Sequence, residues 1–274
     1  VLMVKQAIIP LAGLGTRLLP LSSVIPKELL PINGKPNLEY IMEECIQAGI
    51  KQFIFVIPRN RPSIKKYFFN DNFYKKIIKK KKNDKRLKDV FKRIKRYQKM
   101  IKFVYQNKPE GTGHAVLQCK KYLKGTHFLM LLADDLIVKK NCSKEMIALH
   151  KRTKGSIIAT KRVERKTVQR WGILGFKNKS RNSFLINEVI EKPKLNEAPS
   201  NYAIIGRYIL PMEILSVLKS QGKGKGGEIH ITDAIKTLIK KNKKFYGNIF
   251  KGKYIDCGTL QGFINSGLTI SKYL

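Results

Sequence analysis

Glycine and cationic residues follow the first apolar run of the chain at a spacing that suits phosphate binding. The run 7–11 is followed by Gly13 and Gly15, and then by Arg17 and Lys27. Because glycine has no Cβ, its backbone N–H groups can approach an anion closely. Arginine and lysine can then hold several charges of a polyphosphate. We therefore expect a buried strand that leads into an anion-binding turn.

This turn differs from the common nucleotide fingerprints. Leu18 stands where the third glycine of a dinucleotide-binding G-x-G-x-x-G would fall, and the chain contains no G-x-x-x-x-G-K-[ST]. A nicotinamide enzyme or a P-loop ATPase is therefore disfavoured. On the local pattern alone, a structural glycine turn with surface cations remains an alternative.

Two adjacent carboxylates follow the most apolar segment of the chain. Residues 128–133 lead directly into Asp134 and Asp135. Open α/β sheets bind their ligands at the carboxyl ends of central parallel strands. Since side chains alternate along a strand, we expect only one of the two to point easily into such a site. A helix cap or a solvated turn would also explain the pair.

The segments between these residues alternate between helix and strand patterns. A helix is expected over 37–49 and a buried strand over 52–58, which together with the first strand normally implies a parallel pair. The later segments are expected in this order: strand 101–106, a helix starting within 111–116, strand 128–133, helix 144–152, strand 156–163, strands 172–176, 185–191 and 202–210, helices 211–219 and 232–241, strands 244–250 and 253–256, and a helix from 260. This predicts an α/β fold with a Rossmann-like, doubly wound, mixed but mostly parallel sheet and a smaller second sheet portion.

Basic residues are unusually frequent. The 56 Lys and Arg residues outnumber the 19 Asp and Glu residues and give a net charge of +37. The densest run, 75–102, largely overlaps the segment 63–100, where apolar residues recur at three- and four-residue steps. We interpret it as an amphipathic helix with lysines on its solvated face. The alternative, a nucleic-acid-binding arm with aromatic residues among the lysines, is disfavoured because the excess charge is spread along the chain.

Composition indicates a soluble protein of the cytosol. Of the 274 residues 43% are hydrophobic, and no uncharged apolar run approaches the ~18 residues of a membrane span. Residues 1–4 are too short for the apolar part of an export signal. The four cysteines have no C-x-x-C spacing, so neither a zinc site nor a disulfide framework is expected.

Several motifs, taken together, resemble the sugar-phosphate nucleotidyltransferases. The family signature, G-x-G-T-R-x-x-P followed by P-K, matches 13–20 and 26–27. Further segments resemble the bacterial branch that acts on UTP and glucose-1-phosphate, and they occur in order over nearly the whole chain: 25–31, 44–50, 111–116, 191–194, 227–229 and 232–235.

The resemblance implies a single domain over 1–274, with a nucleotide-binding part at about 1–140 and a sugar-binding part at about 141–274. In the implied reaction a glucose-1-phosphate oxygen attacks the α-phosphorus of UTP, giving UDP-glucose and pyrophosphate without a protein nucleophile. The implied cofactor is Mg²⁺, and a homo-oligomer (dimer or tetramer) is expected, with no membrane and no specific nucleic acid as partner. The same fold also carries thymidylyltransferases, which are the nearest alternative.

The resemblance also carries over site residues. It assigns Arg17 and Lys27 to the triphosphate and Lys192 to the sugar phosphate as catalytic cations, and Asp134 and Asp256 to the metal. The nucleotide-binding positions that it implies are Ala12, Gly13, Gly15, Gln106 and Gly111, and the sugar-binding positions are Gly172, Glu191 and Gly206.

Two further residues are weighed differently. Trp171 stands where a tyrosine is commoner in relatives, so the sugar pocket is expected to differ in shape there. His114 is interpreted as a helix-start or packing residue, without a catalytic role.

Overall fold

A nine-stranded sheet forms the centre of the computed structural model, which describes residues 3–272. The strand order is β5 (Ile101–Tyr105), β4 (Gln52–Ile57), β1 (Gln6–Pro10), β6 (His127–Leu131), β11 (Tyr202–Pro211), β8 (Ser156–Arg162), β12 (Phe245–Ile249), β10 (Ser183–Glu191) and β9 (Gly172–Lys177). The four strands from β5 to β6 are parallel, and β12 is parallel to β8. Only β11 and β10 run against the others within this described sheet. The prediction of a mixed, mostly parallel sheet is confirmed.

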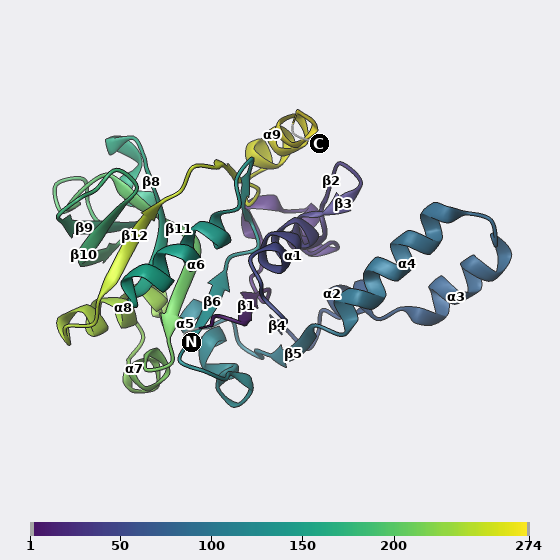
Figure 1. The fold of residues 1–274 in the computed structure, drawn as a ribbon, viewed down its shortest axis with the longest axis horizontal. Coiled ribbons are helices and arrows are strands. Elements are labelled where there is room, and N and C mark those ends of the chain that lie inside the picture. Colours follow the sequence, from purple (N-terminus) through teal and green to yellow (C-terminus); the bar gives the residue numbers. More distant parts are fainter. Residues whose placement is uncertain (1–2, 273–274) are drawn as a thin grey trace.

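Helices cover both faces of the sheet, as Figure 1 shows. Strand β1 illustrates the reason, because Ile8 and Ile9 are both fully buried but belong to different cores. The core on the Ile9 side includes side chains of α1 (Asn37–Gln47) and α6 (Cys142–Thr153). The core on the Ile8 side includes α5 (Thr112–Gln118), α7 (Ile214–Ser220) and α8 (Ile231–Lys240). The sheet is therefore doubly wound, as predicted.

Two short strand pairs lie outside the main sheet. Strand β7 (Asp135–Val138) pairs in antiparallel register with β13 (Lys253–Asp256), and this pairing sets Asp135 opposite Asp256. Strands β2 (Pro31–Ile32) and β3 (Lys35–Pro36) form the other pair. After β13 the chain enters α9 (Leu260–Ser271). The β7–β13 pair brings together carboxylates that are about 120 positions apart in the sequence.

The basic region is a helical hairpin rather than one amphipathic helix. It contains α2 (Ser63–Phe68), α3 (Asp71–Lys80) and α4 (Lys85–Gln98), and α3 with the start of α4 projects away from the sheet (Figure 1). Asp84 ends the expected continuous helix, because its side chain accepts a hydrogen bond from the Leu87 N–H and caps α4. Helix α2 reaches the core through Ile64 and Phe68, and α4 buries Ile94 and Tyr97 near its end. The lysines nevertheless lie mostly on solvated faces, as expected.

None of the helices in residues 3–272 combines the length and apolar character that a membrane crossing needs.

Candidate active site

The glycine turn after β1 is folded back tightly on the residues that follow it. Gly15 adopts a left-handed φ of 67°, and a Cβ at this position would lie 3.1 Å from the Ser22 Cβ. The Ser22 hydroxyl donates a hydrogen bond to the Gly15 carbonyl oxygen at 2.8 Å. This close packing brings the Lys27 side chain, which begins the 3₁₀ turn Lys27–Leu29, underneath the turn.

One cavity opens over this turn, and we call it the turn cavity. It has a volume of about 450 Å³ and lies at the carboxyl ends of β1, β5 and β6. Much of its wall is backbone and small side chains from the turn and from the loop before α5. Its lining residues include Ala12, Gly13, Leu14, Gly15, Lys27, Glu28, Gln106, Pro109, Gly111, Ala133, Asp134 and Glu228. Gly111 has φ 98°, and a Cβ there would lie 2.7 Å from the Ile229 carbonyl oxygen, so this wall leaves no room for a side chain.

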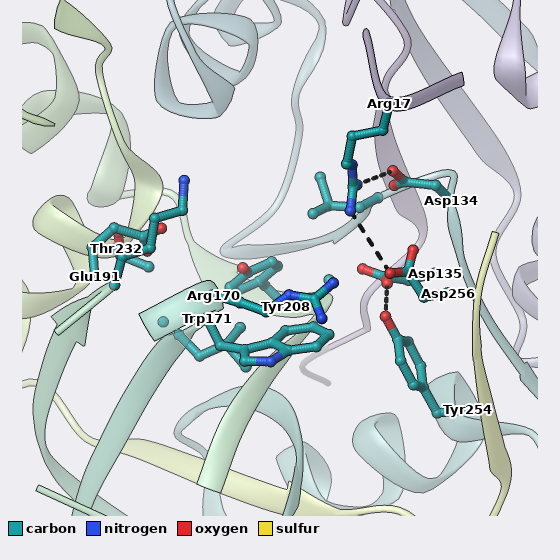
Figure 2. Close-up of a pocket in the computed structure, with 15 residues that line it drawn as sticks. Arg17, Asp134, Asp135, Arg170, Trp171, Glu191, Tyr208, Thr232, Tyr254 and Asp256 are labelled. Atoms are coloured by element: carbon teal, nitrogen blue, oxygen red, sulfur yellow. Dashed lines mark hydrogen bonds and ion pairs between the residues drawn. The ribbon is translucent and has the colours of Figure 1, made fainter. Parts of the chain in front are cut away.

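A second cavity of about 290 Å³, which we call the carboxylate cavity, lies beside the first and is drawn in Figure 2. Charged side chains dominate it. Figure 2 shows Arg17, Asp134 and Asp256 on one side, with Glu191 and Thr232 across from them and Arg170 and Trp171 between. Its other lining residues include Leu132, Asp135, Gly172, Lys192, Gly206, Tyr208 and Tyr254.

Asp134 and Leu132 line both cavities, and Asp134 is held there by two cations. The Lys27 ammonium donates a hydrogen bond to Asp134 Oδ2 at 2.6 Å, and Arg17 Nη2 lies 3.5 Å from the same oxygen. Burial by itself raises the pKa of Asp134, but the charge and hydrogen bond of Lys27 outweigh it, so the pKa is lowered. Burial likewise opposes the charge of Lys27, yet Asp134 raises its pKa overall. Both groups are therefore charged at neutral pH.

Asp256 joins this group through Arg17, whose Nη1 lies 3.7 Å from Asp256 Oδ2. The Asp256 side chain is fixed locally, because its Oδ1 accepts a hydrogen bond from the Gly258 N–H at 2.9 Å. The backbone connects the same elements, since the Cys257 N–H donates to the Asp134 carbonyl oxygen at 2.8 Å. Arg17 thus spans two carboxylates, one in the turn before β7 and one at the end of its partner strand β13.

Asp135 also lines the carboxylate cavity, so the expectation that only one of the adjacent aspartates faces the site is wrong. Asp134 precedes β7 in a turn rather than continuing a strand, so the strict alternation of a strand does not apply. Burial, and then the charge of Asp134, raise the pKa of Asp135 to about 7. The Tyr254 hydroxyl donates a hydrogen bond to Asp135 Oδ1 at 2.5 Å, and the Trp171 ring packs against Tyr254 edge to face.

A fully buried ion pair supports the turn that carries both aspartates. Arg207 donates to Glu44 Oε2 at 2.6 Å and, through Nη1, to the Asp135 carbonyl oxygen at 2.7 Å. Arg207 lies on β11 and Glu44 on α1, so the pair ties the centre of the sheet to the helix beside it. Because an unpaired buried charge is costly, this arrangement fixes the backbone of the turn firmly.

Glycines leave room for carboxylates in the same cavity. A Cβ at Gly206 would lie 2.2 Å from Asp135 Oδ2, and one at Gly172 would lie 3.1 Å from Glu191 Oε2. Lys192, next to Glu191, has a left-handed φ of 45°, and its N–H donates to the Trp171 carbonyl oxygen. These contacts hold β9, β10 and β11 together around the cavity.

Each site residue predicted from the sequence lines one of the two cavities. The turn cavity contains Ala12, Gly13, Gly15, Lys27, Gln106 and Gly111, the carboxylate cavity contains Arg17, Gly172, Glu191, Lys192, Gly206 and Asp256, and Asp134 lies in both. The sequence argument did not single out Glu28, Glu228, Arg170, Tyr208, Thr232 or Tyr254, which also line the cavities. Glu28 and Thr232 lie inside matched family motifs, and Arg170 is next to Trp171. These neighbours in the sequence could therefore have indicated that the three residues belong to the site.

Within residues 3–272 no group of three or more His, Cys, Asp or Glu side chains is arranged to hold a metal ion. The candidate donors are the two carboxylates Asp134 and Asp256. This set suits Mg²⁺, which binds through one or two carboxylates and completes its octahedron with water and substrate phosphate oxygens.

The fold and the site define a class of enzyme. An anion-binding turn at the end of a parallel sheet adjoins a cavity of cations and carboxylates, as expected for an enzyme that joins two phosphorylated substrates. A family model described as nucleotidyl transferase matches residues 6–272, so the chain belongs to the nucleotidyl transferase family.

Within that family the chain is similar to UTP–glucose-1-phosphate uridylyltransferases. It is 36% identical to UTP–glucose-1-phosphate uridylyltransferase 2 of Staphylococcus saprophyticus over 266 residues, covering 96% of this chain and 90% of that protein. A solved structure of UDP-glucose pyrophosphorylase complexed with UDP-glucose matches with a TM-score of 0.87 and 33% identity, covering 99% of this chain and 100% of that chain. The UTP-bound enzyme of Acinetobacter baumannii matches with a TM-score of 0.87 and 31% identity, covering 98% and 93%.

Proposed function

We propose that this protein transfers a uridylyl group from UTP to glucose-1-phosphate, giving UDP-glucose and pyrophosphate. The observation that carries the proposal is the shared wall of the two cavities at Asp134. With UTP in the turn cavity and glucose-1-phosphate in the carboxylate cavity, the α-phosphorus and the attacking phosphate oxygen meet beside this residue. Holding two reactants in this geometry can supply ~7–11 kcal/mol of the barrier.

The cations around this junction neutralise charge on the two polyanions. Arg17 and Lys27 reach the junction from the turn, where they bind the triphosphate and stabilise pyrophosphate as it leaves. Lys192 lies in the carboxylate cavity and binds the phosphate of the sugar. Because the substrate oxygen is itself the nucleophile, the chain needs only to bind, orient and stabilise charge.

Asp134 and Asp256 would hold Mg²⁺. When bound, the ion supplies Lewis-acid stabilisation of the charge that develops on the phosphate oxygens. The chain's own contribution is to bring the two carboxylates together through the β7–β13 pair and through Arg17. On substrate binding, Lys27 and Arg17 exchange these carboxylate contacts for contacts to phosphate.

The remaining site residues bind the base and the sugar. Gln106 and Gly111 face the base, and Ala12, Gly13 and Gly15 present the turn backbone to the nucleotide. Glu191 accepts hydrogen bonds from glucose hydroxyls, while Gly172 and Gly206 let the backbone and Asp135 approach the sugar. Burial of these groups gives directional recognition of an uncharged sugar ring.

A panel of nucleoside triphosphates tests this function. The protein is incubated with glucose-1-phosphate, Mg²⁺ and UTP, dTTP, CTP, ATP or GTP, and the released pyrophosphate is measured. UTP should give the highest kcat/KM. A preference for dTTP would assign the chain to thymidylyl transfer, and no pyrophosphate with any nucleotide would overturn nucleotidyl transfer to this sugar phosphate.

The same proposal divides the chain into a nucleotide-binding part at about 1–140 and a sugar-binding part at about 141–274 of one domain. Strand β11 supports the single domain, because it lies beside β6 in the middle of the sheet. Glu228, from the sugar-binding part, lines the turn cavity, and Arg17, from the nucleotide-binding part, lines the carboxylate cavity.

The location proposed is the cytoplasm, which is supported by four buried cysteines that form no disulfide.

A homo-oligomer, either a dimer or a tetramer, is also part of the proposal. Leu260, Ile264 and Leu268 recur every fourth residue on α9 with side chains 62%, 52% and 66% exposed, which forms an apolar stripe. A second copy of the chain would cover it. Because the net charge of +37 repels identical copies, association should strengthen with salt. In sedimentation experiments the Ile264→Asp variant should dissociate into single chains, whereas the control variant Asn265→Asp should remain assembled. If Ile264→Asp assembled like the wild type, α9 would not belong to the interface.

A further inference from the structure

The side chain of Gln106 enters the turn cavity in one defined orientation. Gln106 follows β5, is 4% exposed, and is anchored by its N–H, which donates to the Ile57 carbonyl oxygen. Its side-chain Nε2 lies 3.3 Å from the Gly111 carbonyl oxygen and 2.9 Å from His114 Nδ1. A carbonyl oxygen can only accept a hydrogen bond, so the atom that faces it must be the amide NH₂.

The same contacts decide the protonation of the His114 ring. Because both hydrogens of the Gln106 NH₂ point to acceptors, His114 Nδ1 must be the unprotonated nitrogen. The ring proton is then on Nε2, which lies 2.9 Å from Gln118 Nε2 and 3.6 Å from Glu110 Oε2. Two donors cannot face each other, so this tautomer requires the Gln118 amide in its other orientation, with Oε1 towards the ring. Gln118 makes no other side-chain hydrogen bond within residues 3–272 that would oppose this orientation.

Only the carbonyl oxygen Oε1 of Gln106 is left to meet a ligand. It has no hydrogen-bond partner in the described part of the chain, and it is not one of the atoms sealed from solvent there. Beside it, the Gly111 N–H also makes no hydrogen bond in that part of the chain. The cavity therefore offers one acceptor and one donor next to each other.

An acceptor beside a donor complements the N3–H and carbonyl oxygen of uracil. Cytosine in the same place presents the opposite pattern, an N3 acceptor and an amino donor, so both contacts would be repulsive there. The loop that carries Gly111 is held rigidly, because the Gly113 N–H donates to the Ile229 carbonyl oxygen and the Ile229 N–H donates to that of Glu110. Gln106 is the one member of the pair that a 180° rotation about a single bond, Cγ–Cδ, would reverse.

We infer that His114 is a positioning residue that sets the base specificity of the turn cavity. By accepting from the Gln106 amide, it keeps the Gln106 oxygen towards the base, so that the cavity selects uracil over cytosine. This inference rests on the proposed uridylyl transfer and adds the residue that selects its nucleotide. His114 itself lines neither the turn cavity nor the carboxylate cavity, so its effect should be confined to base recognition through Gln106.

The test compares UTP with CTP in three variants of the full chain. His114→Leu removes the acceptor and should lower the ratio of kcat/KM for UTP over CTP by at least about 10-fold, with an unchanged KM for glucose-1-phosphate. His114→Asn keeps an acceptor near Nδ1 and should restore most of the ratio. His127→Leu, the matched control outside both cavities, should leave the ratio unchanged.

The equilibrium affinities of UTP and CTP, measured by calorimetry without the sugar phosphate, separate this inference from the reaction. Failure of uridylyl transfer with a retained UTP preference would reject the proposed function and keep the role of His114. An unchanged UTP to CTP ratio in His114→Leu would overturn that role. If the variant does not fold, ¹⁵N NMR of the wild-type histidines decides, since a His114 ring protonated on Nδ1 contradicts the inference.

Discussion

The two cavities lie side by side on one sheet but are lined by different kinds of residue. The turn cavity is lined largely by glycine and other small residues of the turn 12–16 and the loop 109–112, and Lys27 is its one lysine among the described residues. The carboxylate cavity is walled by side chains, with three aspartates, one glutamate and three cations. The first relies on a rigid chain path, whereas the second relies on pairing of opposite charges. Substitutions should therefore act differently in the two cavities.

The largest effect is expected at Asp134, because it belongs to both cavities. Asp134→Asn removes the charge that Lys27 and Arg17 contact and one of the two proposed metal ligands. We expect kcat to fall by at least about 10³-fold while the thermal unfolding temperature stays close to that of the wild type. Steady-state kinetics against Mg²⁺ concentration measures this. Asp89→Asn on exposed α4 is the control, and a variant at position 134 within tenfold of wild-type kcat would remove the residue from the mechanism.

A substitution on the sugar side should leave the nucleotide side intact. Lys192→Ala removes a cation of the carboxylate cavity, so the KM for glucose-1-phosphate should rise and kcat/KM should fall by about 10²-fold. The dissociation constant of UTP should not change. Lys194→Ala, exposed two residues further on, is the matched control. If UTP affinity fell instead, Lys192 would belong to the triphosphate and the comparison of the two cavities would be wrong at this point.

Glycine substitutions test the difference in construction directly. At Gly206 an added methyl group would lie 2.2 Å from Asp135 Oδ2, so Gly206→Ala should destabilise the fold by about 1–3 kcal/mol and weaken sugar-phosphate binding. A methyl group added at Gly13 would have no atom of the described structure within 4 Å apart from those of the adjacent residues. The Gly13→Ala variant should therefore keep its stability and lose only nucleotide affinity. Chemical denaturation together with the two KM values measures both. Equal loss of stability would show that the turn is packed as tightly as β11.

The turn cavity was the more predictable of the two from the sequence, for a physical reason. Gly13, Gly15 and Lys27 of this cavity lie within about 15 residues, and a turn between them is a local feature of the chain. The carboxylate cavity depends on non-local strand pairing, such as the register that sets Asp135 opposite Asp256. Only the family resemblance pointed to Asp256, Glu191 and Lys192, and no local pattern indicated Tyr254 or Arg170.

The same distinction explains the errors in the fold. Strand alternation wrongly excluded Asp135, because the chain turns at Asp134 before β7 starts. The apolar spacing of 63–100 was read as one helix, whereas short breaks near Phe69 and Asp84 divide it into three. Periodicity detects a helical face, but it does not locate a turn that is set by capping and by packing of α2 against α4.

The effect with the least consequence for catalysis is expected from Glu28, which is buried in the turn cavity and should change the pH dependence of stability. Burial raises its pKa to about 7, although the charge of Lys27 opposes the shift. Since the folded pKa lies above the unfolded value of 4.5, Glu28 contributes fully to stability below pH 4.5, and this contribution is lost as the pH rises through about 7. Glu28→Gln should abolish this loss, which is on the order of 3 kcal/mol. Denaturation of the free protein at pH 5 and pH 8 measures the difference, with Glu164→Gln on the exposed surface as control.

Because Asp135 titrates near the same pH in the other cavity, part of the wild-type dependence should persist in Glu28→Gln and disappear only when Asp135→Asn is added. A single variant that flattened the whole profile would mean that the two cavities are not separately charged.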